Sequence, residues 1–219
     1  MGKDILTLCG AGLAILSCVC TIISFSTSYW LESYGEANSR FRNLGLWEAC
    51  FNKFAYDRDS LGKTYDGCAW IFSYEYRPIF DWLNPNWFLA VQVMMTLNLI
   101  ISLVVSLLCL LGILNFCPPQ RRSIAQLTNS ILIFSCAALI TLSIIIFGVK
   151  SDIDRQWLSR PDQNYLSWSF GLAVVAGFLA IFSGMCLLVD SLRLAQIRRK
   201  AKAPPPYAGY KMSTVPPQY

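Results

Sequence analysis

The chain has 219 residues, of which 55% are hydrophobic and 14% are charged, and its formal net charge is +5. A soluble domain typically carries about a quarter charged residues, so this composition excludes an ordinary soluble globular protein. The charges are also segregated, because four long stretches contain no Asp, Glu, Lys or Arg. These uncharged runs cover residues 5–31, 82–120, 123–149 and 163–189.

Each run is long enough for one membrane span, since about 20 apolar residues suffice for a helix to cross the bilayer. The predicted spans cover residues 5–27, 88–116, 127–149 and 167–189. The run 82–120 has room for two helices, but Pro85 and the sequence CPPQ at its ends confine it to one. A cleaved signal peptide is the alternative interpretation of the first run, although that run is longer than a usual signal core.

Basic residues predict the orientation of these spans. An even number of spans places both termini on one side, and that side holds nine basic and two acidic residues. The other side holds nine basic and eleven acidic residues, but basic residues next to span ends weigh most, so both termini are expected in the cytoplasm. The net positive charge is therefore a topology signal and does not indicate nucleic-acid binding. The segments outside the spans are the N-terminus 1–4, a first outer loop 28–87, a cytoplasmic turn 117–126, a second outer loop 150–166 and a tail 190–219.

Aromatic residues gather at the predicted outer ends of the spans. Rings with a polar edge favour the headgroup region, so most of these residues are interpreted as an interfacial belt. They are Trp30, Trp82, Trp87, Trp157, Tyr165 and Trp168.

The nine cysteines fall into two groups according to their predicted position relative to the membrane. Only Cys50 and Cys68 lie in an outer loop, where a pair in an oxidising compartment most simply forms one disulfide. Two free thiols or intermolecular pairing are the alternatives, and a zinc site is disfavoured because the chain has no histidine. The other seven lie within spans or at their cytoplasmic ends and are Cys9, Cys18, Cys20, Cys109, Cys117, Cys136 and Cys186.

The sequence around Cys50 and Cys68 predicts a small antiparallel sheet. In DGCAWIFSYEY, residues 66–76, the period-2 rule places Cys68, Trp70 and the following aromatic residues on one face. We expect this aromatic face to pack on the bundle rather than to bind a ligand. The stretch LGLWEACF is also compatible with a strand, and a bulge between Trp47 and Cys50 would place both on one face.

The outer-loop pattern resembles the W-GLW-C-C signature of the claudin superfamily, through Trp30, Gly45, Leu46, Trp47, Cys50 and Cys68. The resemblance covers residues 1–190, and divergent claudin-like proteins of invertebrate septate junctions are the better match. It implies an α-helical membrane protein, a four-helix bundle with a disulfide-stapled antiparallel sheet formed mainly by the first outer loop. It also implies that Trp47 packs at the base of the sheet and that Cys50 pairs with Cys68.

Three features depart from the claudin pattern. Seventeen residues separate the two outer cysteines, more than in typical vertebrate claudins, so the hairpin between them is enlarged. Claudins usually carry an arginine just before the second span, whereas the nearest arginine here is Arg77, ten residues short of Trp87. Many claudins end in a hydrophobic residue that binds PDZ domains, whereas this chain ends VPPQY.

The predicted spans contain no ionisable residue, which argues against a transporter, a proton relay or a voltage sensor. Gln92 and Asn98 are interpreted as interhelical hydrogen bonds. The chain also lacks histidine and a phosphate-binding loop, so we predict a non-enzyme without a cofactor. Small residues recur every four positions in the first and fourth spans and predict close helix contacts, at Gly10, Ala14, Cys18, Ala176, Ala180 and Gly184.

The tail is predicted to be disordered, with a basic segment near the inner leaflet followed by a Pro- and Tyr-rich segment. Its sequence PPPY matches the PPxY ligand of WW domains through Pro204, Pro205 and Tyr207, and a featureless tail is the alternative. Cys117 and Cys186 lie near the cytoplasmic face and are candidates for palmitoylation.

The resemblance implies a cell–cell junction protein in the lateral plasma membrane of an epithelium. Such a protein binds itself or other claudin-like proteins in cis and in trans, and forms or organises the paracellular diffusion barrier. The alternative is an auxiliary subunit of an ion channel or receptor, because the superfamily includes such proteins with the same four-span plan. A gap-junction channel is disfavoured, since residues 150–166 contain no cysteine.

Overall fold

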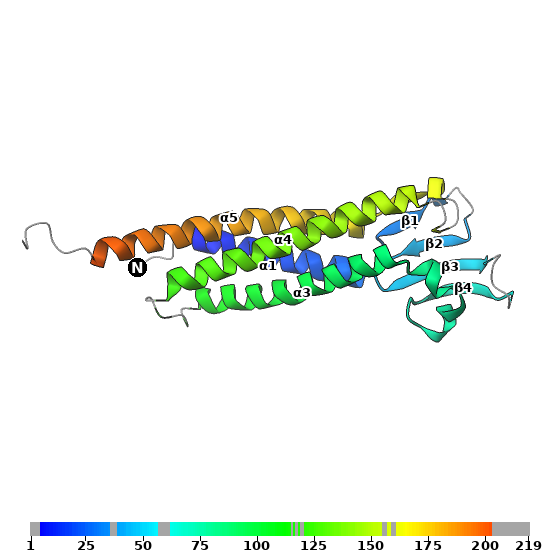
Figure 1. The fold of residues 1–219 in the computed structure, drawn as a ribbon, viewed down its shortest axis with the longest axis horizontal. Helices are drawn as coiled ribbons and strands as arrows, with labels where there is room; N and C mark the ends of the chain where they lie inside the picture. The colour runs from blue at the N-terminus through cyan, green and yellow to red at the C-terminus, as the bar shows by residue number, and fades with distance from the viewer. Residues whose placement is uncertain are drawn as a thin grey trace, which may run out of the picture.

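A computed structural model describes residues 5–35, 39–56, 62–114, 116, 118, 121–154, 157–158 and 161–202. Within these residues, four helices are long and apolar enough to cross a membrane. They lie side by side in an elongated bundle, with a small sheet at one end, and α5 ends at the opposite end (Figure 1). The helices are α1 (Ile5–Ser26), α3 (Asn86–Ile113), α4 (Arg122–Ile153) and α5 (Trp168–Lys202). The predicted four-span architecture is therefore confirmed.

The helix ends differ from the predicted span ends at several places. Helix α4 includes residues 122–126, which were assigned to the cytoplasmic turn, and α5 continues thirteen residues past the predicted span end at Val189. The prediction of disorder from residue 190 is thus wrong for residues 190–202. The segment RLAQIRRKAK consists mostly of strong helix formers, so it extends the helix that precedes it. Residues 203–219, including the PPxY sequence, lie outside the described residues.

Small and hydroxylated residues hold the helices together, as the four-residue spacing predicted. A Cβ at Gly10 would lie 2.9 Å from the Leu187 side chain, and a Cβ at Gly184 would lie 2.9 Å from that of Phe134. The close approach lets serine side chains reach backbone carbonyls of the neighbouring helix: Ser17 Oγ donates to the Ala176 carbonyl at 2.8 Å. These close contacts and hydrogen bonds hold α5 against α1 and α4. They are needed because no hydrophobic force drives helices together within lipid.

The outer sheet has five antiparallel strands in the order β4-β3-β2-β1-β5. Its strands are β1 (Leu31–Ser33), β2 (Phe41–Leu44), β3 (Glu48–Ala55), β4 (Thr64–Trp70) and β5 (Asn164–Leu166). Four strands come from the first outer loop, as predicted, and β5 comes from the second. Sequence reasoning missed β5, because three residues are too few to show an alternating pattern.

The strand predicted over residues 66–76 is too long, since β4 ends at Trp70. A turn at residues 71–73 leads into a 3-10 helix, η2 (Tyr74–Ile79), and a short helix, α2 (Phe80–Leu83). This segment folds back under the sheet, where the Tyr76 hydroxyl donates to the Ala49 carbonyl at 2.9 Å. Pro78 lies within η2 and could not have donated to a strand ladder.

The aromatic face predicted from that strand is also wrong. Trp70 is 56% exposed and Tyr74 is 86% exposed, whereas Tyr76 alone of the aromatic set is fully buried. The covered face of β4 is instead the one that carries Tyr65, and Cys68 lies on the opposite, open face. Strand parity was assigned correctly, but the turn after Trp70 ends the alternation on which the prediction relied.

No bulge separates Trp47 from Cys50. The β3–β4 ladder runs regularly from Glu48 opposite Trp70 to Cys50 opposite Cys68. Register shifts occur elsewhere, between Phe41 and Asn43 on β2 and between Phe51 and Phe54 on β3. Lys53 lies within the second shift and has a φ of 47°. This left-handed conformation is typical of the extra residue in a β-bulge.

The main hydrophobic core joins the sheet to the outer half of the bundle. Trp30 and Trp157 were assigned to an interfacial belt, but they are 0% and 2% exposed and belong to this core. The Trp30 ring packs edge-on against Phe147 of α4 and Phe170 of α5, with centroid distances of 5.0 and 5.6 Å. Its Nε1 donates to the Ser24 carbonyl at 2.8 Å, which satisfies the indole inside the protein. Trp168 is half exposed, as a belt residue should be.

We predict that Trp30→Phe lowers the free energy of unfolding by about 2 kcal/mol, through lost buried volume and one lost hydrogen bond. Thermal unfolding of the purified chain in detergent measures the change. The matched control is Trp168→Phe at the half-exposed position, for which the expected change is under about 0.5 kcal/mol. Equal effects of the two substitutions would contradict a core role for Trp30.

Candidate functional site on the outer sheet

The Gly45-Leu46-Trp47 motif forms the turn between β2 and β3, closed by a hydrogen bond from the Gly45 N–H to the Glu48 carbonyl at 2.8 Å. This turn lies directly on the end of α1. A Cβ on Gly45 would lie 2.4 Å from the Thr27 carbonyl oxygen and 2.5 Å from the Ser28 Cα. Both are backbone atoms that cannot rotate away, so only glycine allows the approach.

Leu46 connects the same turn to α3. Its side chain is fully buried, and its carbonyl accepts a hydrogen bond from Gln92 Nε2 at 2.7 Å. Gln92 therefore bonds to the outer loop and not to another helix, in contrast to the sequence interpretation. The Asn98 amide is also buried, but it has no hydrogen-bond partner among the described residues.

Trp47 packs at the base of the sheet. Its ring centroid lies 5.1 Å from that of Phe25 near the end of α1 and 6.2 Å from that of Phe72 after β4. The side chain is partly buried and is in contact with the main core. The three residues of the turn thus contact α1 through Gly45 and Trp47, and α3 through Leu46.

Cys50 and Cys68 form a disulfide across β3 and β4, as predicted, at directly opposed positions with a Cα–Cα distance of 4.0 Å. The Cys50 side of the bond is buried, and Cys68 is exposed. Ligand atoms of Glu48, Cys50 and Cys68 lie within 4.8 Å of one another. Both sulfurs are oxidised in the disulfide, so this group offers a single carboxylate and no thiolate to a metal.

The open face of the sheet carries a polar cavity of about 490 Å³, here called the outer groove. It is lined by side chains from β1, β2 and β3 and by the disulfide, including Glu32, Arg42, Asn52, Cys50 and Cys68. Cys50 and Asn52 are two apart on β3 and therefore point to the same face. The groove presents charges of both signs beyond the ends of the helices.

Hydrogen bonds from the second outer loop hold Glu32 at one side of the groove. Its carboxylate accepts a hydrogen bond from the Oγ of Ser167, the residue between that loop and α5, at 2.8 Å. The carboxylate also raises the pKa of Tyr165, first through a hydrogen bond that favours the neutral phenol. The ring of Tyr165 lies 4.8 Å from that of Tyr34, so the two outer loops form one surface here.

The opposite face of the sheet is covered. Phe51 packs against Phe54 and Tyr76, and Phe54 stacks on Trp82 with a centroid distance of 5.4 Å. Burial, followed by the nearby charge of Glu75, raises the pKa of Tyr76, so its hydroxyl remains a hydrogen-bond donor. Among the described residues, the sheet thus has one packed face and one wet face, and the outer groove lies on the wet face.

The remaining sequence candidates lie away from the outer sheet. Cys186 is partly buried in the second half of α5, and a Cβ on Gly10 would lie 3.2 Å from its Cβ. Sequence reasoning did not identify Glu32, Arg42 and Asn52 as a set. The alternation on β3 could have placed Asn52 with Cys50, but the partner positions on β1 and β2 depend on a register that the sequence does not reveal. Cys117, Pro204, Pro205 and Tyr207 lie outside the described residues.

Comparison with known families adds one finding. A family model described as PMP-22/EMP/MP20/Claudin tight junction matches residues 15–189. The match covers most of the chain and includes every residue of the outer-loop signature. No match was found among curated proteins.

We predict that Gly45→Ala destabilises the protein by about 3 kcal/mol, because the added methyl group overlaps fixed backbone atoms at the end of α1. The readout is the unfolding temperature in detergent, together with the amount that reaches the cell surface. Gly35→Ala is the matched control, since a Cβ at Gly35 meets no atom within 4 Å in the part of the chain that the structure describes. A Gly45→Ala protein as stable as the control would show that the turn does not need its close approach.

Proposed function

The chain belongs to the PMP-22/EMP/MP20/claudin tight junction family, and from this premise we propose that it forms or organises the paracellular diffusion barrier of an epithelium. In this proposal it lies in the lateral plasma membrane with both termini in the cytoplasm. It binds itself or other claudin-like proteins, side by side in one membrane and across the intercellular gap. Family membership points to a non-enzymatic structural protein.

The observation that carries this proposal is the rigid attachment of the outer sheet to the bundle. The sheet is cross-linked by a disulfide, packed on α1 and α3 through the motif turn, and joined to the second outer loop through β5. A surface that restricts solutes must hold its shape against thermal motion, and each of these contacts removes a degree of freedom. The open outer groove is then presented at a fixed height above the membrane.

The distribution of charge supports the proposed orientation in the membrane. Arg121, Arg122 and the basic end of α5 lie at the end of the bundle opposite the sheet, where the positive-inside rule places the cytoplasm. The PPxY sequence would then face cytoplasmic WW domains, and Cys186 would face the compartment in which palmitoylation occurs.

Depletion of the protein from an epithelium is expected to increase the passage of an uncharged tracer between cells, and the wild-type chain should restore the barrier. The double variant Cys50→Ser/Cys68→Ser removes the cross-link, which contributes about 3 kcal/mol to the stability of the outer sheet. The double variant should reach the surface in reduced amount. It should also restore less of the barrier than the wild-type chain when both are compared at equal surface amounts. The control is Cys9→Ser, which changes an exposed cysteine of α1.

A barrier that stays intact after depletion, in tissue without a redundant relative, would contradict the proposal. Co-purification of a large channel or receptor in that case would favour the role of an auxiliary subunit.

We further predict that charge in the outer groove tunes which ions cross the barrier. Arg42 is exposed and lines the groove, so Arg42→Glu should raise the permeability ratio of cations to anions by roughly twofold or more. Dilution potentials across a reconstituted cell layer measure this ratio. The control, Arg77→Glu, makes the same charge change on η2, which packs on the covered side of the sheet. Equal shifts from both variants would show that ions do not pass along the groove.

A further inference from the structure

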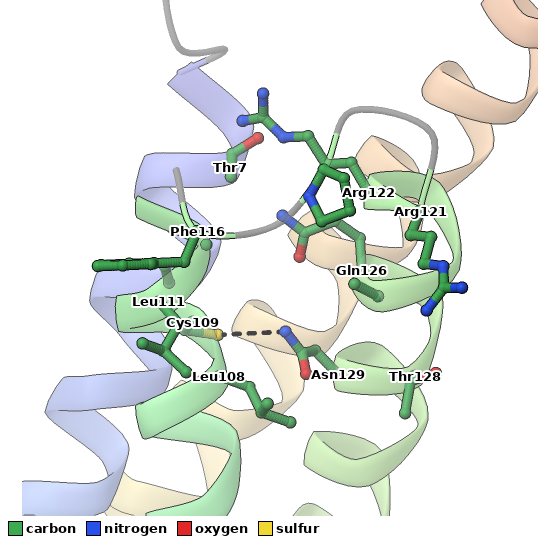
Figure 2. Close-up of a pocket in the computed structure, with 14 residues that line it drawn as sticks. Thr7, Leu108, Cys109, Leu111, Phe116, Arg121, Arg122, Gln126, Thr128 and Asn129 are labelled. Atoms are coloured by element: carbon green, nitrogen blue, oxygen red, sulfur yellow. Dashed lines mark hydrogen bonds between the residues drawn. The ribbon is translucent and has the colours of Figure 1, made fainter. Parts of the chain in front are cut away.

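A second cavity, of about 630 Å³, lies at the other end of the bundle, among residues of α1, α3 and α4. It is remote from the outer sheet and has no role in the barrier proposed above. Figure 2 shows Thr7 of α1, Leu108 and Leu111 of α3, and Gln126 and Asn129 of α4 around it. Its volume is in the range of sites that bind small amphiphilic molecules.

The inner wall of this cavity is apolar and open to the lipid side of the bundle. Ala11, Leu108, Leu111 and Gly112 contribute to the wall. Leu108 and Leu111 are each more than a third exposed on α3, so the cavity is continuous with the surface that faces the hydrocarbon. Gly112 has open space where a side chain would lie, since a Cβ there meets no atom of the described residues within 4 Å. An acyl chain of the bilayer therefore has direct access to this wall.

The mouth of the cavity is positively charged. It contains Arg121, the N-cap residue of α4, and Arg122, its first residue, and no side chain of the described residues caps this helix end. The unpaired N–H groups of a first helical turn carry partial positive charge and attract anions. In Figure 2 the Arg122 side chain extends across the mouth toward Thr7, whereas Arg121 points away from it.

A buried acceptor points to a ligand with a hydrogen-bond donor. Gln126 lines the cavity, is 7% exposed, and its Oε1 has no hydrogen-bond partner among the described residues. Buried acceptors are rarely left without a donor. Among the described residues, the acid in contact with the lining is Asp190 of α5, which is 1% exposed and already accepts a hydrogen bond from Thr7 Oγ1 at 2.8 Å. Asp190 does not line the cavity, whereas Arg121 and Arg122 do, so the charged side chains of the lining are both cationic.

We propose that this cavity binds one anionic phospholipid of the adjoining leaflet. The phosphate lies against Arg122 and the first turn of α4, and a hydroxyl or ammonium group of the headgroup donates to Gln126 Oε1. One acyl chain lies along the apolar wall formed by α1 and α3. A free phosphate ion would satisfy the mouth but leave that wall empty, so the continuity of the wall with the lipid surface favours a lipid.

The test uses the full chain, purified in a neutral detergent and titrated with phosphatidylserine, phosphatidylcholine or inorganic phosphate. The expected result is a rise in unfolding temperature that saturates with phosphatidylserine and is absent with the other two. Arg122→Gln is expected to weaken the apparent affinity for phosphatidylserine about tenfold, as the loss of one charge-assisted hydrogen bond implies. No saturable shift with phosphatidylserine would overturn the proposal, and an equal shift with inorganic phosphate would replace the lipid with a free anion.

Two further variants separate the cavity from general attraction to basic residues. Gly112→Leu places a side chain in the open space of the apolar wall, so the protein should fold normally and lose the phosphatidylserine shift. Arg198→Gln removes an exposed charge from the distal part of α5 and should leave the apparent affinity unchanged. If Arg198→Gln weakens binding as much as Arg122→Gln, or Gly112→Leu retains full binding, the lipid does not occupy this cavity.

Discussion

The structure depends on the burial of Trp30 where the sheet meets the helices. Its backbone N–H donates to the Leu44 carbonyl of β2, and its carbonyl accepts from the N–H of Ser167, which joins the second outer loop to α5. Its side chain meanwhile fills the space between α4 and α5 and bonds back to the end of α1. One residue therefore couples three helices, the sheet and both outer loops. Trp30 thus acts together with the disulfide, the motif turn and β5 to hold the outer groove against the bundle.

Sequence reasoning predicted the features that depend on one segment at a time. The lengths of the uncharged runs predicted four spans. The presence of Cys50 and Cys68 in an oxidising outer compartment predicted their pairing. It failed where the environment of a residue depends on a distant segment. A tryptophan next to a span is equally compatible with headgroups or with a protein core, and only the packing of Phe147 and Phe170 around Trp30 decides between them. Strand β5 exists because β1 offers it an edge, and the register that assembles Glu32, Arg42 and Asn52 is likewise a property of the folded sheet.

The two ends of the bundle present different chemistry. The outer groove is polar, carries both signs of charge and belongs to a cross-linked sheet. The inner cavity combines an apolar wall with arginines and is bounded by helices alone. Between them the helices are packed through small residues and serine hydrogen bonds, which leave little freedom for one helix to slide along another. A ligand at the inner end would thus be held by a rigid frame that also supports the outer end.

The length of α5 has a consequence for the C-terminal tail. Thirteen residues of continuous helix, at about 1.5 Å each, extend roughly 20 Å beyond the predicted end of the fourth span. This distance exceeds the depth of a headgroup layer. Arg193, near the start of the extension, can therefore contact anionic lipid, whereas the rest of the helix serves as a stiff spacer. A partner protein that binds after residue 202 would be held clear of the bilayer, with room for a folded domain between itself and the lipid.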